Sequence, residues 1–285
     1  MHTRRIGDVQ VSAIGLGAMP MSIEGRPDEE RSLATLHAAL DAGVTLIDTA
    51  DAYHRDADEV GHNETLVAKA LATHERGRDV LVATKGGHLR PGDGTWTLDG
   101  SPAHLKRACE ASLRRLGVEA IGLYQFHRPD PRIPYAESVG ALRELLDEGK
   151  IRMAGISNAD PQQIRQAYDI LDGRLVSVQN QFSPAFRSSV PELRLCDELG
   201  IAFLPWSPLG GIARAGELGS AHAAFARIAK ARAVSPQRVC LAWMLAQSPV
   251  VIPIPGASRP ETILDSAAAA ELALDAVEVA ELDAA

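Results

Sequence analysis

The feature that most constrains this chain is a short apolar run, Val44 to Ile47, which ends at the acid Asp48 and is followed on the next loop by Tyr53. A continuous apolar run of this length is typical of a strand that is buried on both faces of a parallel sheet. Because an unpaired carboxylate is costly to desolvate, Asp48 at the end of such a strand needs a cation or several hydrogen-bond donors. The run therefore predicts a polar site at the carboxyl end of a buried strand.

Three later apolar segments also end at polar residues. The carboxyl ends of parallel strands meet at one end of a barrel, where barrel enzymes place their catalytic groups. We therefore expect the polar residues that follow these strands to lie close to Asp48. In chain order they are Lys85 after 80–84, His127 after 121–126, and Ser157 with Asn158 after 153–156.

Strand and helix patterns alternate along the chain without a break in composition. Such alternation indicates an α/β protein, and eight strand–helix units favour a closed (β/α)8 TIM barrel over two domains. We predict a single domain over residues 1–285. The candidate strands begin near residues 14, 44, 80, 121, 151, 175, 201 and 250. The candidate helices span about 27–42, 63–76, 102–116, 135–148, 161–171, 190–199, 221–233 and 236–247.

The barrel has additions at both ends and two long loops. The alternating pattern from Thr3 to Ile14 predicts an N-terminal β-hairpin, and the alanine-rich tail from Glu261 predicts extra helices. Residues 90–100 and 207–219 are glycine-rich and are expected to be loops that border the substrate. Trp96 in the first loop is either an apolar wall of the substrate site or a residue that packs the loop itself.

Charge and cysteine usage limit the partners and the compartment. The formal net charge is −8 at pH 7 without a basic block, which argues against nucleic acid or an anionic membrane surface as a partner. No stretch approaches the ~20 apolar residues of a membrane span, and the N-terminal segment lacks the apolar core of a signal peptide. Cys109, Cys196 and Cys240 are widely spaced and odd in number, as expected of buried free thiols. We expect a cytoplasmic protein.

No metal site is predicted. His54, His62 and His88 show no recognisable metal-ligand spacing. The acids on the loop around Tyr53 are interpreted as a solvated acidic loop rather than a cation site. They are Asp51, Asp56, Asp58 and Glu59.

Asp48, Tyr53, Lys85 and His127 together resemble the catalytic tetrad of the aldo-keto reductase family. The resemblance covers nearly the whole chain, because further motifs of the family occur in order at the expected strand ends. These motifs are Gly15-Leu16-Gly17, Leu46-Ile47-Asp48-Thr49-Ala50, Thr84-Lys85, Tyr124-Gln125-Phe126-His127-Arg128-Pro129, Gly155-Ile156-Ser157-Asn158, Val178-Gln179-Asn180, Trp206-Ser207-Pro208-Leu209 and Ile254-Pro255-Gly256.

The resemblance assigns a role to each member of the tetrad. Reduction of a carbonyl by hydride transfer develops negative charge on oxygen, so a proton donor is needed there. Tyr53 would be this general acid, and the general base of the reverse oxidation. A phenol with a pKa of ~10 is a reluctant acid, and we expect the ammonium of Lys85, positioned by Asp48, to lower that pKa. His127 would orient the carbonyl oxygen or assist its protonation.

Each of these residues has a structural alternative when it is considered alone. Asp48 could cap a turn, Lys85 could be a solvated cation, and His127 could be a satisfied structural histidine. Tyr53 could be a half-buried residue of the rim. Their joint placement at the ends of successive strands favours the catalytic interpretation.

The same resemblance implies a nicotinamide site on the later strands. Ser157, Asn158 and Gln179 would hydrogen-bond the carboxamide, and Trp206 would stack its flat apolar face on the ring. Two alternatives stay open: Ser157-Asn158 could cap the next helix, and Gln179 could be structural. The residues expected along the pyrophosphate are Ser207, Leu209 and Gly210.

The adenosine end is expected after the last strand. No GxGxxG motif opens a strand–helix unit, so a Rossmann domain is not indicated. Instead, Gly256 and Ser258 lead into a helix whose N-terminus can bind phosphate. Arg259 suits the 2′-phosphate of NADPH, so we expect NADPH rather than NADH, with a solvated surface arginine as the alternative. Asp265-Ser266 stands where the family usually has Glu-Asn or Gln-Asn for the adenosine, and Asp265 is expected to contact it.

Together these expectations describe an NADPH-dependent reductase that converts an aldehyde or ketone to an alcohol. Its partner would be a small carbonyl compound, and the family is typically monomeric. One alternative is an NADP(H)-binding regulatory or sensing protein of the same fold, against which the complete tetrad argues. The other is an oxidative dehydrogenase of a pyridoxine-like alcohol, which would use the same Tyr53.

Overall fold

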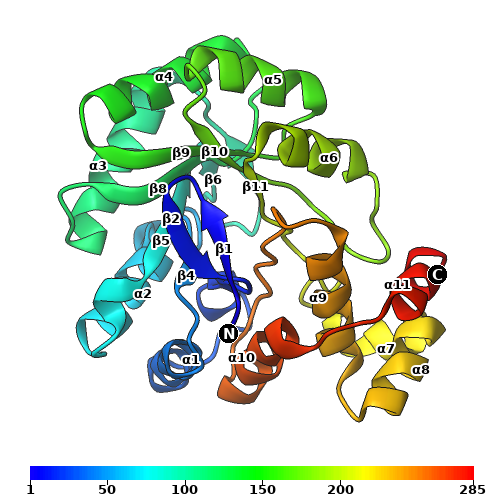
Figure 1. Cartoon of the computed structure of the whole chain (residues 1–285). Coiled ribbons are helices and arrows are strands. Elements are labelled where there is room, and N and C mark those ends of the chain that lie inside the picture. The colour runs from blue at the N-terminus through cyan, green and yellow to red at the C-terminus, as the bar shows by residue number, and fades with distance from the viewer.

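The computed structural model describes residues 1–285 and centres on a parallel sheet of seven strands. The strands follow one another across the sheet in the order β11–β10–β9–β8–β5–β4–β3, and the sheet curls around its own axis with helices outside (Figure 1). This is the (β/α)8 architecture predicted from the sequence. The strands are β3 (Leu16–Gly17), β4 (Leu46–Asp48), β5 (Leu81–Gly86), β8 (Ile121–Phe126), β9 (Ile151–Ser157), β10 (Leu175–Gln179) and β11 (Ala202–Phe203).

The eighth predicted strand is an irregular segment, residues 250–256, that closes the ring. On one side it forms a bridge between Val251 and Phe203 of β11, and on the other a bridge between Gly256 and Gly17 of β3. The amide of Ile252 donates to the carbonyl of Phe203 at 2.8 Å, and the amide of Gly17 donates to the carbonyl of Pro255 at 2.9 Å. Because Pro253 and Pro255 have no N–H, the segment can only accept hydrogen bonds from β3, and no continuous ladder forms.

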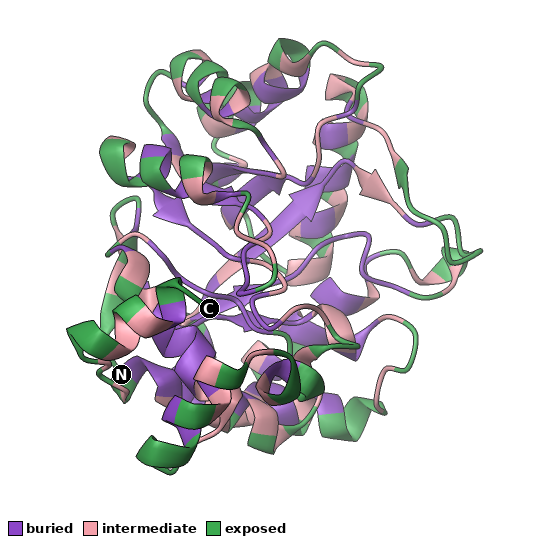
Figure 2. Cartoon of the chain, turned by 90° about the vertical axis from the view of Figure 1, so that its right-hand side faces the viewer, coloured by how far each residue is buried: buried purple, intermediate pink, exposed green.

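The predicted helices are present. The helix expected at 221–233 spans Ala223–Arg232, because His222 has extended backbone, φ −133° and ψ 90°, and a separate short helix, Leu218–Ala221, which the sequence pattern did not show, precedes it. The faces turned toward the sheet are buried and the outer faces are exposed (Figure 2). The helices are α1 (Glu29–Asp41), α2 (His62–Ala72), α3 (Pro102–Leu116), α4 (Tyr135–Asp147), α5 (Pro161–Ile170), α6 (Val190–Leu199), α7 (Leu218–Ala221), α8 (Ala223–Arg232), α9 (Pro236–Gln247), α10 (Pro260–Ala267) and α11 (Ala276–Asp283). None of them is long and apolar enough to cross a membrane.

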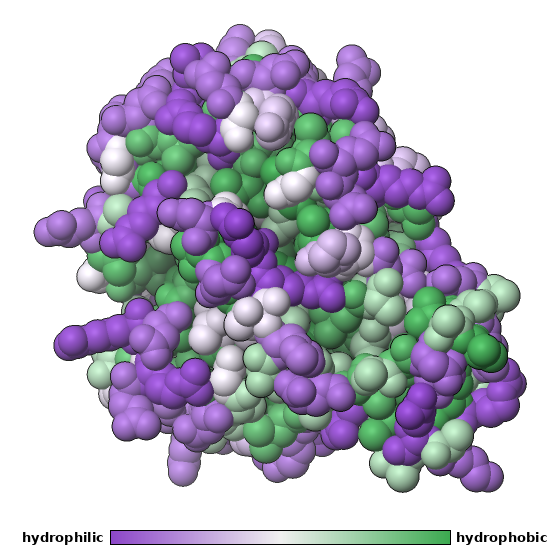
Figure 3. All heavy atoms as spheres, in the orientation of Figure 1, coloured by the Kyte–Doolittle hydropathy of each residue, from purple (hydrophilic) through white to green (hydrophobic).

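The predicted N-terminal hairpin closes one end of the barrel. Strands β1 (Thr3–Ile6) and β2 (Val9–Ser12) pair antiparallel and lie across the near end of the barrel in Figure 1. Ile6 and Val11 are buried in one apolar cluster with barrel residues such as Leu46 and Leu123. The surface on this side is hydrophilic along most of its rim, with apolar residues between (Figure 3). The barrel interior is therefore packed and dry at its amino-terminal end.

The period-two alternation of the strands then places polar residues at the opposite end of the interior. In β4, Leu46 belongs to the interior cluster, Ile47 packs among the helices, and Asp48 follows Leu46 on the inner face. By the same alternation, Lys85 of β5 and Gln125 of β8 face inward above apolar neighbours, and they are direct partners in the strand register. The fold thus gathers the polar ends of these three strands above an apolar floor.

Two further expectations concern loops and thiols. The segment 90–100 is not wholly a loop, because its base is an antiparallel ribbon of β6 (His88–Leu89) and β7 (Thr97–Leu98). The three cysteines are free and buried, as predicted.

The packing of side chains inside the barrel can be tested by a substitution at Gly155 of β9. An alanine Cβ there would lie 2.2 Å from Ser177 Oγ and 2.9 Å from Gln125 Cγ, so neighbouring side chains must move. We expect Gly155→Ala to lower the free energy of unfolding by ~1–3 kcal/mol in urea titrations. The matched control is Gly140→Ala on α4, where nothing lies within 4 Å of the added Cβ. It should raise that free energy by ~0.5–1 kcal/mol, because alanine favours the helix. Equal effects of the two changes would contradict the packing described.

Candidate active site

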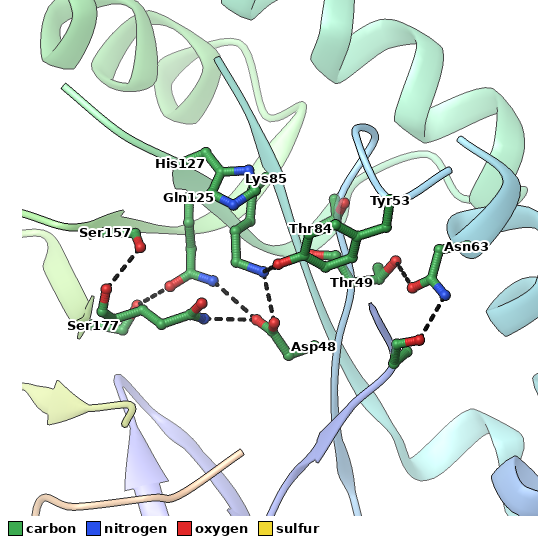
Figure 4. A network of polar contacts seen from close by, with 12 residues as sticks. Asp48, Thr49, Tyr53, Asn63, Thr84, Lys85, Gln125, His127, Ser157 and Ser177 are labelled. Carbon is green, nitrogen blue, oxygen red and sulfur yellow. Dashed lines mark hydrogen bonds and ion pairs between the residues drawn. The ribbon is translucent and has the colours of Figure 1, made fainter. Parts of the chain in front are cut away.

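The ammonium group of Lys85 is the centre of the polar end of the barrel. Its Nζ donates to Asp48 Oδ1 at 2.6 Å, to the carbonyl of Thr49 at 2.8 Å and to Tyr53 Oη at 3.2 Å (Figure 4). The Lys85 side chain is fully buried. The structure therefore brings together three members of the predicted tetrad through one nitrogen atom.

Asp48 is held by two glutamine side chains in addition to Lys85. Gln179 Nε2 donates to Asp48 Oδ2 at 2.7 Å, and Gln125 Nε2 lies 3.4 Å from the same oxygen. Burial alone would lower the pKa of Lys85, but the charges of Asp48 and Tyr53 and the hydrogen bonds to both together outweigh burial, and the net pKa is raised. Lys85 is therefore a fixed cation and Asp48 is its fully hydrogen-bonded counterion.

The phenol of Tyr53 differs from the expectation in one respect. Burial raises its pKa, the Lys85 ammonium lowers it, and the carboxylate of Asp48 raises it, so that the net pKa lies above its ordinary value. The predicted lowering by Lys85 exists but is smaller than the effect of desolvation. Tyr53 is consequently a protonated phenol at neutral pH, which is the form that donates a proton.

His127, the fourth member, stands edge-on to Tyr53. The two ring centroids are 5.7 Å apart at an interplanar angle of 82°. Burial lowers the pKa of His127 well below its ordinary value, and the nearby cations Lys85 and Arg128 lower it further. Its Nδ1 is buried without a hydrogen-bond partner. The imidazole is therefore neutral and can still form a hydrogen bond with a ligand atom.

These groups border a cavity of about 350 Å³ that opens at the carboxyl end of the barrel. One wall is formed by Tyr53, His127, His88 of β6 and Trp96 of the segment 90–100. The opposite side contains most of the residues predicted to bind a cofactor. Those that line the cavity are Ser157, Asn158, Gln179, Trp206, Ser207, Leu209 and Gly256.

Several of the predicted carboxamide ligands are already hydrogen-bonded within the protein. Ser157 Oγ donates to the carbonyl of Gln179 at 2.7 Å, and Asn158 Nδ2 donates to the carbonyl of His127 at 3.0 Å. The helix-cap alternative for Ser157-Asn158 is wrong, because Asp160 caps α5 in a capping box. In contrast, Trp206 Nε1 is buried without a partner.

Of the residues predicted for the adenosine end, Gly256 lines the cavity, whereas Ser258, Arg259 and Asp265 do not. Ser258 and Arg259 lie before α10, and Arg259 is an exposed N-cap residue without a side-chain cap. Asp265 Oδ1 accepts from Arg238 Nη2 at 2.6 Å, and Ser235 donates to its other oxygen. Gly210 adjoins the lining residue Leu209 but is not part of the wall. The Arg238 contact is a partner for Asp265 that the sequence did not suggest.

Asp51 corrects the interpretation of the acidic loop. It is buried, its Oδ1 has no partner, and burial with the nearby charge of Glu64 raises its pKa well above the ordinary value. The other acids of the loop lie at or near the surface, and Glu59 pairs with Arg26 at 2.8 Å. Asp51 is not solvated because it follows β4 directly and its amide donates to the carbonyl of Lys85.

Sequence analysis gave no separate role to His88, Arg128 and Gln125. Gln125 and Arg128 flank His127 in a motif that was considered only as a whole. His88 stacks on Trp96 with centroids 4.6 Å apart, and Trp96 also stacks on Arg90 at 4.9 Å. Trp96 therefore fulfils both alternatives, since it lines the cavity and packs its own loop.

Comparison with known proteins agrees with this geometry. Residues 13–285 match the model of the Aldo/keto reductase family. The chain is 34% identical over 287 residues to an uncharacterized oxidoreductase of Schizosaccharomyces pombe, with 99% of this chain and 89% of that protein covered. Its fold is similar to that of a glycerol dehydrogenase from Gluconobacter oxydans, with a TM-score of 0.84, 28% identity and coverage of 99% and 94% of the two chains. An aldo-keto reductase from Klebsiella pneumoniae in complex with NADPH gives a TM-score of 0.82 at 29% identity, with coverage of 99% and 94%.

The buried pair predicts a thermodynamic cycle. Lys85→Met or Asp48→Asn alone leaves one buried group without its partner and should lower the free energy of unfolding by ~3–5 kcal/mol. The double variant should lose less than the sum, because no lone charge remains. Urea unfolding of the four proteins measures the coupling.

The control for this cycle is Lys106→Met, which breaks an exposed pair with Glu144 and should change stability by ~0–1 kcal/mol. Strictly additive losses for Lys85 and Asp48 would show that the two side chains do not stabilise each other.

Proposed function

This chain belongs to the aldo/keto reductase family and is an NAD(P)H-dependent oxidoreductase of carbonyl compounds, and we propose that it uses NADPH to reduce an aldehyde or ketone with Tyr53 as the general acid. The observation that carries the proposal is the position of Lys85 Nζ, 2.6 Å from Asp48 Oδ1 and 3.2 Å from Tyr53 Oη, directly behind these two residues that line the cavity. A protonated phenol beside a fixed ammonium can release its proton to a developing alkoxide and leave a stabilised phenolate.

The other residues of the site then have distinct tasks. Asp48 keeps Lys85 charged and in place, and neutral His127 presents a polar ring edge to the carbonyl oxygen. A carbonyl that accepts hydrogen bonds from Tyr53 and His127 is oriented with its carbon facing the opposite wall of the cavity. Burial of both groups strengthens these contacts, because little water competes with them.

The opposite wall suits a nicotinamide ring. Trp206 offers a flat face and an unpartnered Nε1, and Gly17 and Gly256, which have no side chain, line the cavity beside it. The residues that would hold the ring are Ser157, Asn158, Gln179 and Trp206. When bound, the dihydronicotinamide supplies the hydride.

The preference for NADPH rests on two points. The similar protein from Klebsiella pneumoniae binds NADPH, and Arg259 stands exposed at the start of α10, where a 2′-phosphate could be met by its guanidinium. Ser258 would add an amide and a hydroxyl to the same phosphate. The Ser207–Gly210 turn, with Ser207 at φ 49°, would follow the pyrophosphate.

The oxidative direction is the second candidate. The similarity to a glycerol dehydrogenase favours it, and the geometry permits it, because Tyr53 as a phenolate can accept the proton of an alcohol. We also propose that residues 1–285 act as one domain, since the ring closes only when the segment 250–256 meets β3.

Tyr53→Phe tests the general acid. It removes the hydroxyl but keeps the ring, so NADPH-dependent reduction of an aldehyde panel should fall by ~10²–10⁴-fold in kcat. The dissociation constant of NADPH, measured by fluorescence, should change little. A parallel series with NADH tests the role of Arg259. Wild-type activity that survives in Tyr53→Phe would disprove the assignment, and tight NADPH binding without turnover of any carbonyl by the wild-type protein would favour the sensing alternative.

The pKa shifts predict opposite pH profiles for the two directions. Reduction needs protonated Tyr53, whose pKa is raised, so kcat/KM should be level from about pH 6 to about pH 9 and fall only above about pH 10. Oxidation needs the phenolate, so its kcat/KM should rise about tenfold per pH unit over the same range. His127 adds no step there, because its pKa lies well below its ordinary value. A reductive profile that falls with a midpoint near pH 7 would contradict a raised pKa.

A further inference from the structure

Arg128 is a cation of the cavity wall that has no counterion. It follows His127 directly at the end of β8 and is half-buried. Its Nη2 donates to Asn158 Oδ1 at 3.0 Å, and its Nε is buried without a partner. The guanidinium takes part in no salt bridge, unlike the pairs formed elsewhere in the chain. The guanidinium of Arg128 therefore has an N–H donor without an acceptor and a positive charge without a counterion at the cavity wall.

Most other part-buried arginines are paired or more fully hydrogen-bonded, and the exception Arg76, which donates only to the carbonyl of Leu40, does not line the cavity. Arg26 forms a two-pronged pair with Glu59 at 2.8 and 2.9 Å, and Arg115 pairs with the buried Glu64 at 2.5 Å. Arg4 has no carboxylate, but its guanidinium donates to three backbone carbonyls at 2.5 to 2.6 Å. Because buried charges are normally paired or saturated with hydrogen bonds, an arginine that is neither calls for a ligand.

Arg128 lies close to the groups that would handle the carbonyl. Its charge lowers the pKa of His127 and that of His88, and the two rings stand edge-on with centroids 4.9 Å apart. Burial brings the pKa of His88 to about 4, so this ring is neutral at physiological pH. The two other permanent cations near these rings are paired, Lys85 with Asp48 and Arg90, which stacks on Trp96, with Glu24. The substrate side of the cavity therefore carries one uncompensated positive charge.

We propose that Arg128 binds a carboxylate of the substrate, so that the preferred substrates are aldehydes or ketones that also carry a carboxylate group. The inference rests on the proposed function and specifies its substrate class. A guanidinium presents parallel N–H donors that match the two oxygens of a carboxylate. In the reaction the carbonyl carbon gains the hydride and its oxygen gains the proton of Tyr53, while the carboxylate is unchanged.

One other role for Arg128 must be separated from this one. Its bond to Asn158 could position that side chain for the cofactor, in which case Arg128 would affect all substrates equally and would also affect NADPH binding. Recognition of a carboxylate affects instead the ratio between charged and neutral substrates. The ratio is therefore the quantity to measure.

The experiment compares two matched pairs of aldehydes. One is 4-carboxybenzaldehyde with its amide, 4-formylbenzamide, and the other is succinic semialdehyde with its amide. The proteins are the wild type, Arg128→Gln, Arg128→Lys and, as a control for the loss of a surface charge, Arg107→Gln on the exposed face of α3. Values of kcat/KM are determined with NADPH at low and high salt, and the dissociation constant of NADPH is measured for each protein.

We expect the wild type to prefer the carboxylate over the amide by about 10- to 100-fold in at least one pair, since hydrogen bonds to charged groups in a partly buried site are strong. Arg128→Gln should abolish this ratio, Arg128→Lys should keep part of it, and Arg107→Gln should leave it unchanged. High salt should reduce it. No preference in the wild type, or an equal loss for both members of each pair in Arg128→Gln, would overturn the inference.

A binding measurement separates this inference from the proposed function. Benzoate and benzamide are titrated into the wild type and Arg128→Gln, with and without NADP⁺, and the fluorescence of the cavity residues Trp96 and Trp206 is followed. Binding of benzoate over benzamide that needs Arg128 supports the inference even if no aldehyde is reduced, which would defeat only the reductase proposal. Reduction of both pairs without Arg128-dependent binding or preference would leave the reductase in place and defeat the carboxylate site.

Discussion

The buried ion pair between Asp48 and Lys85 is the interaction on which the site depends. Lys85 is completely enclosed, and its charge persists because Asp48 Oδ1 and the carbonyl of Thr49 accept hydrogen bonds from its ammonium group. Asp48 is in turn held by the side-chain amides of Gln179 and Gln125. The phenol of Tyr53 then experiences two opposing effects, desolvation that keeps it protonated and an ammonium that makes the phenolate accessible. A general acid that also serves in reverse needs both.

The barrel separates apolar packing from the polar site along its axis. The hairpin end is filled by an apolar cluster that includes Ile6 and Val11, and the opposite end collects the polar side chains. Around the cavity there are two cations in different situations, because Lys85 is paired and acts on a proton, whereas Arg128 is unpaired and faces the substrate side. Charge compensation is therefore the property by which the proposed catalytic cation, Lys85, differs from the proposed substrate-binding cation, Arg128.

Much of the fold could be predicted because local patterns and tertiary structure agree. Helices α3 and α9 begin with serine caps, at Ser101 and Ser235, and their bounds match the periodicity. The prediction of secondary structure was least complete where the structure depends on backbone hydrogen bonding rather than on the pattern of side chains. Pro253 and Pro255 prevent a regular eighth strand, and the 90–100 loop contains a ribbon that a glycine-rich pattern does not reveal.

The sequence by itself determined the barrel and, through its strand ends and its resemblance to the aldo-keto reductase family, predicted Asp48, Tyr53, Lys85 and His127 as a group, because the carboxyl ends of parallel strands share one rim. Only the tertiary structure decided how strongly each is desolvated and what else approaches it. It showed that burial changes the pKa of Tyr53 more than the charge of Lys85 does. It also showed that Asp51 is buried and that Arg128 has no carboxylate partner. Desolvation and charge pairing arise from residues distant in the chain, so a sequence pattern does not contain them.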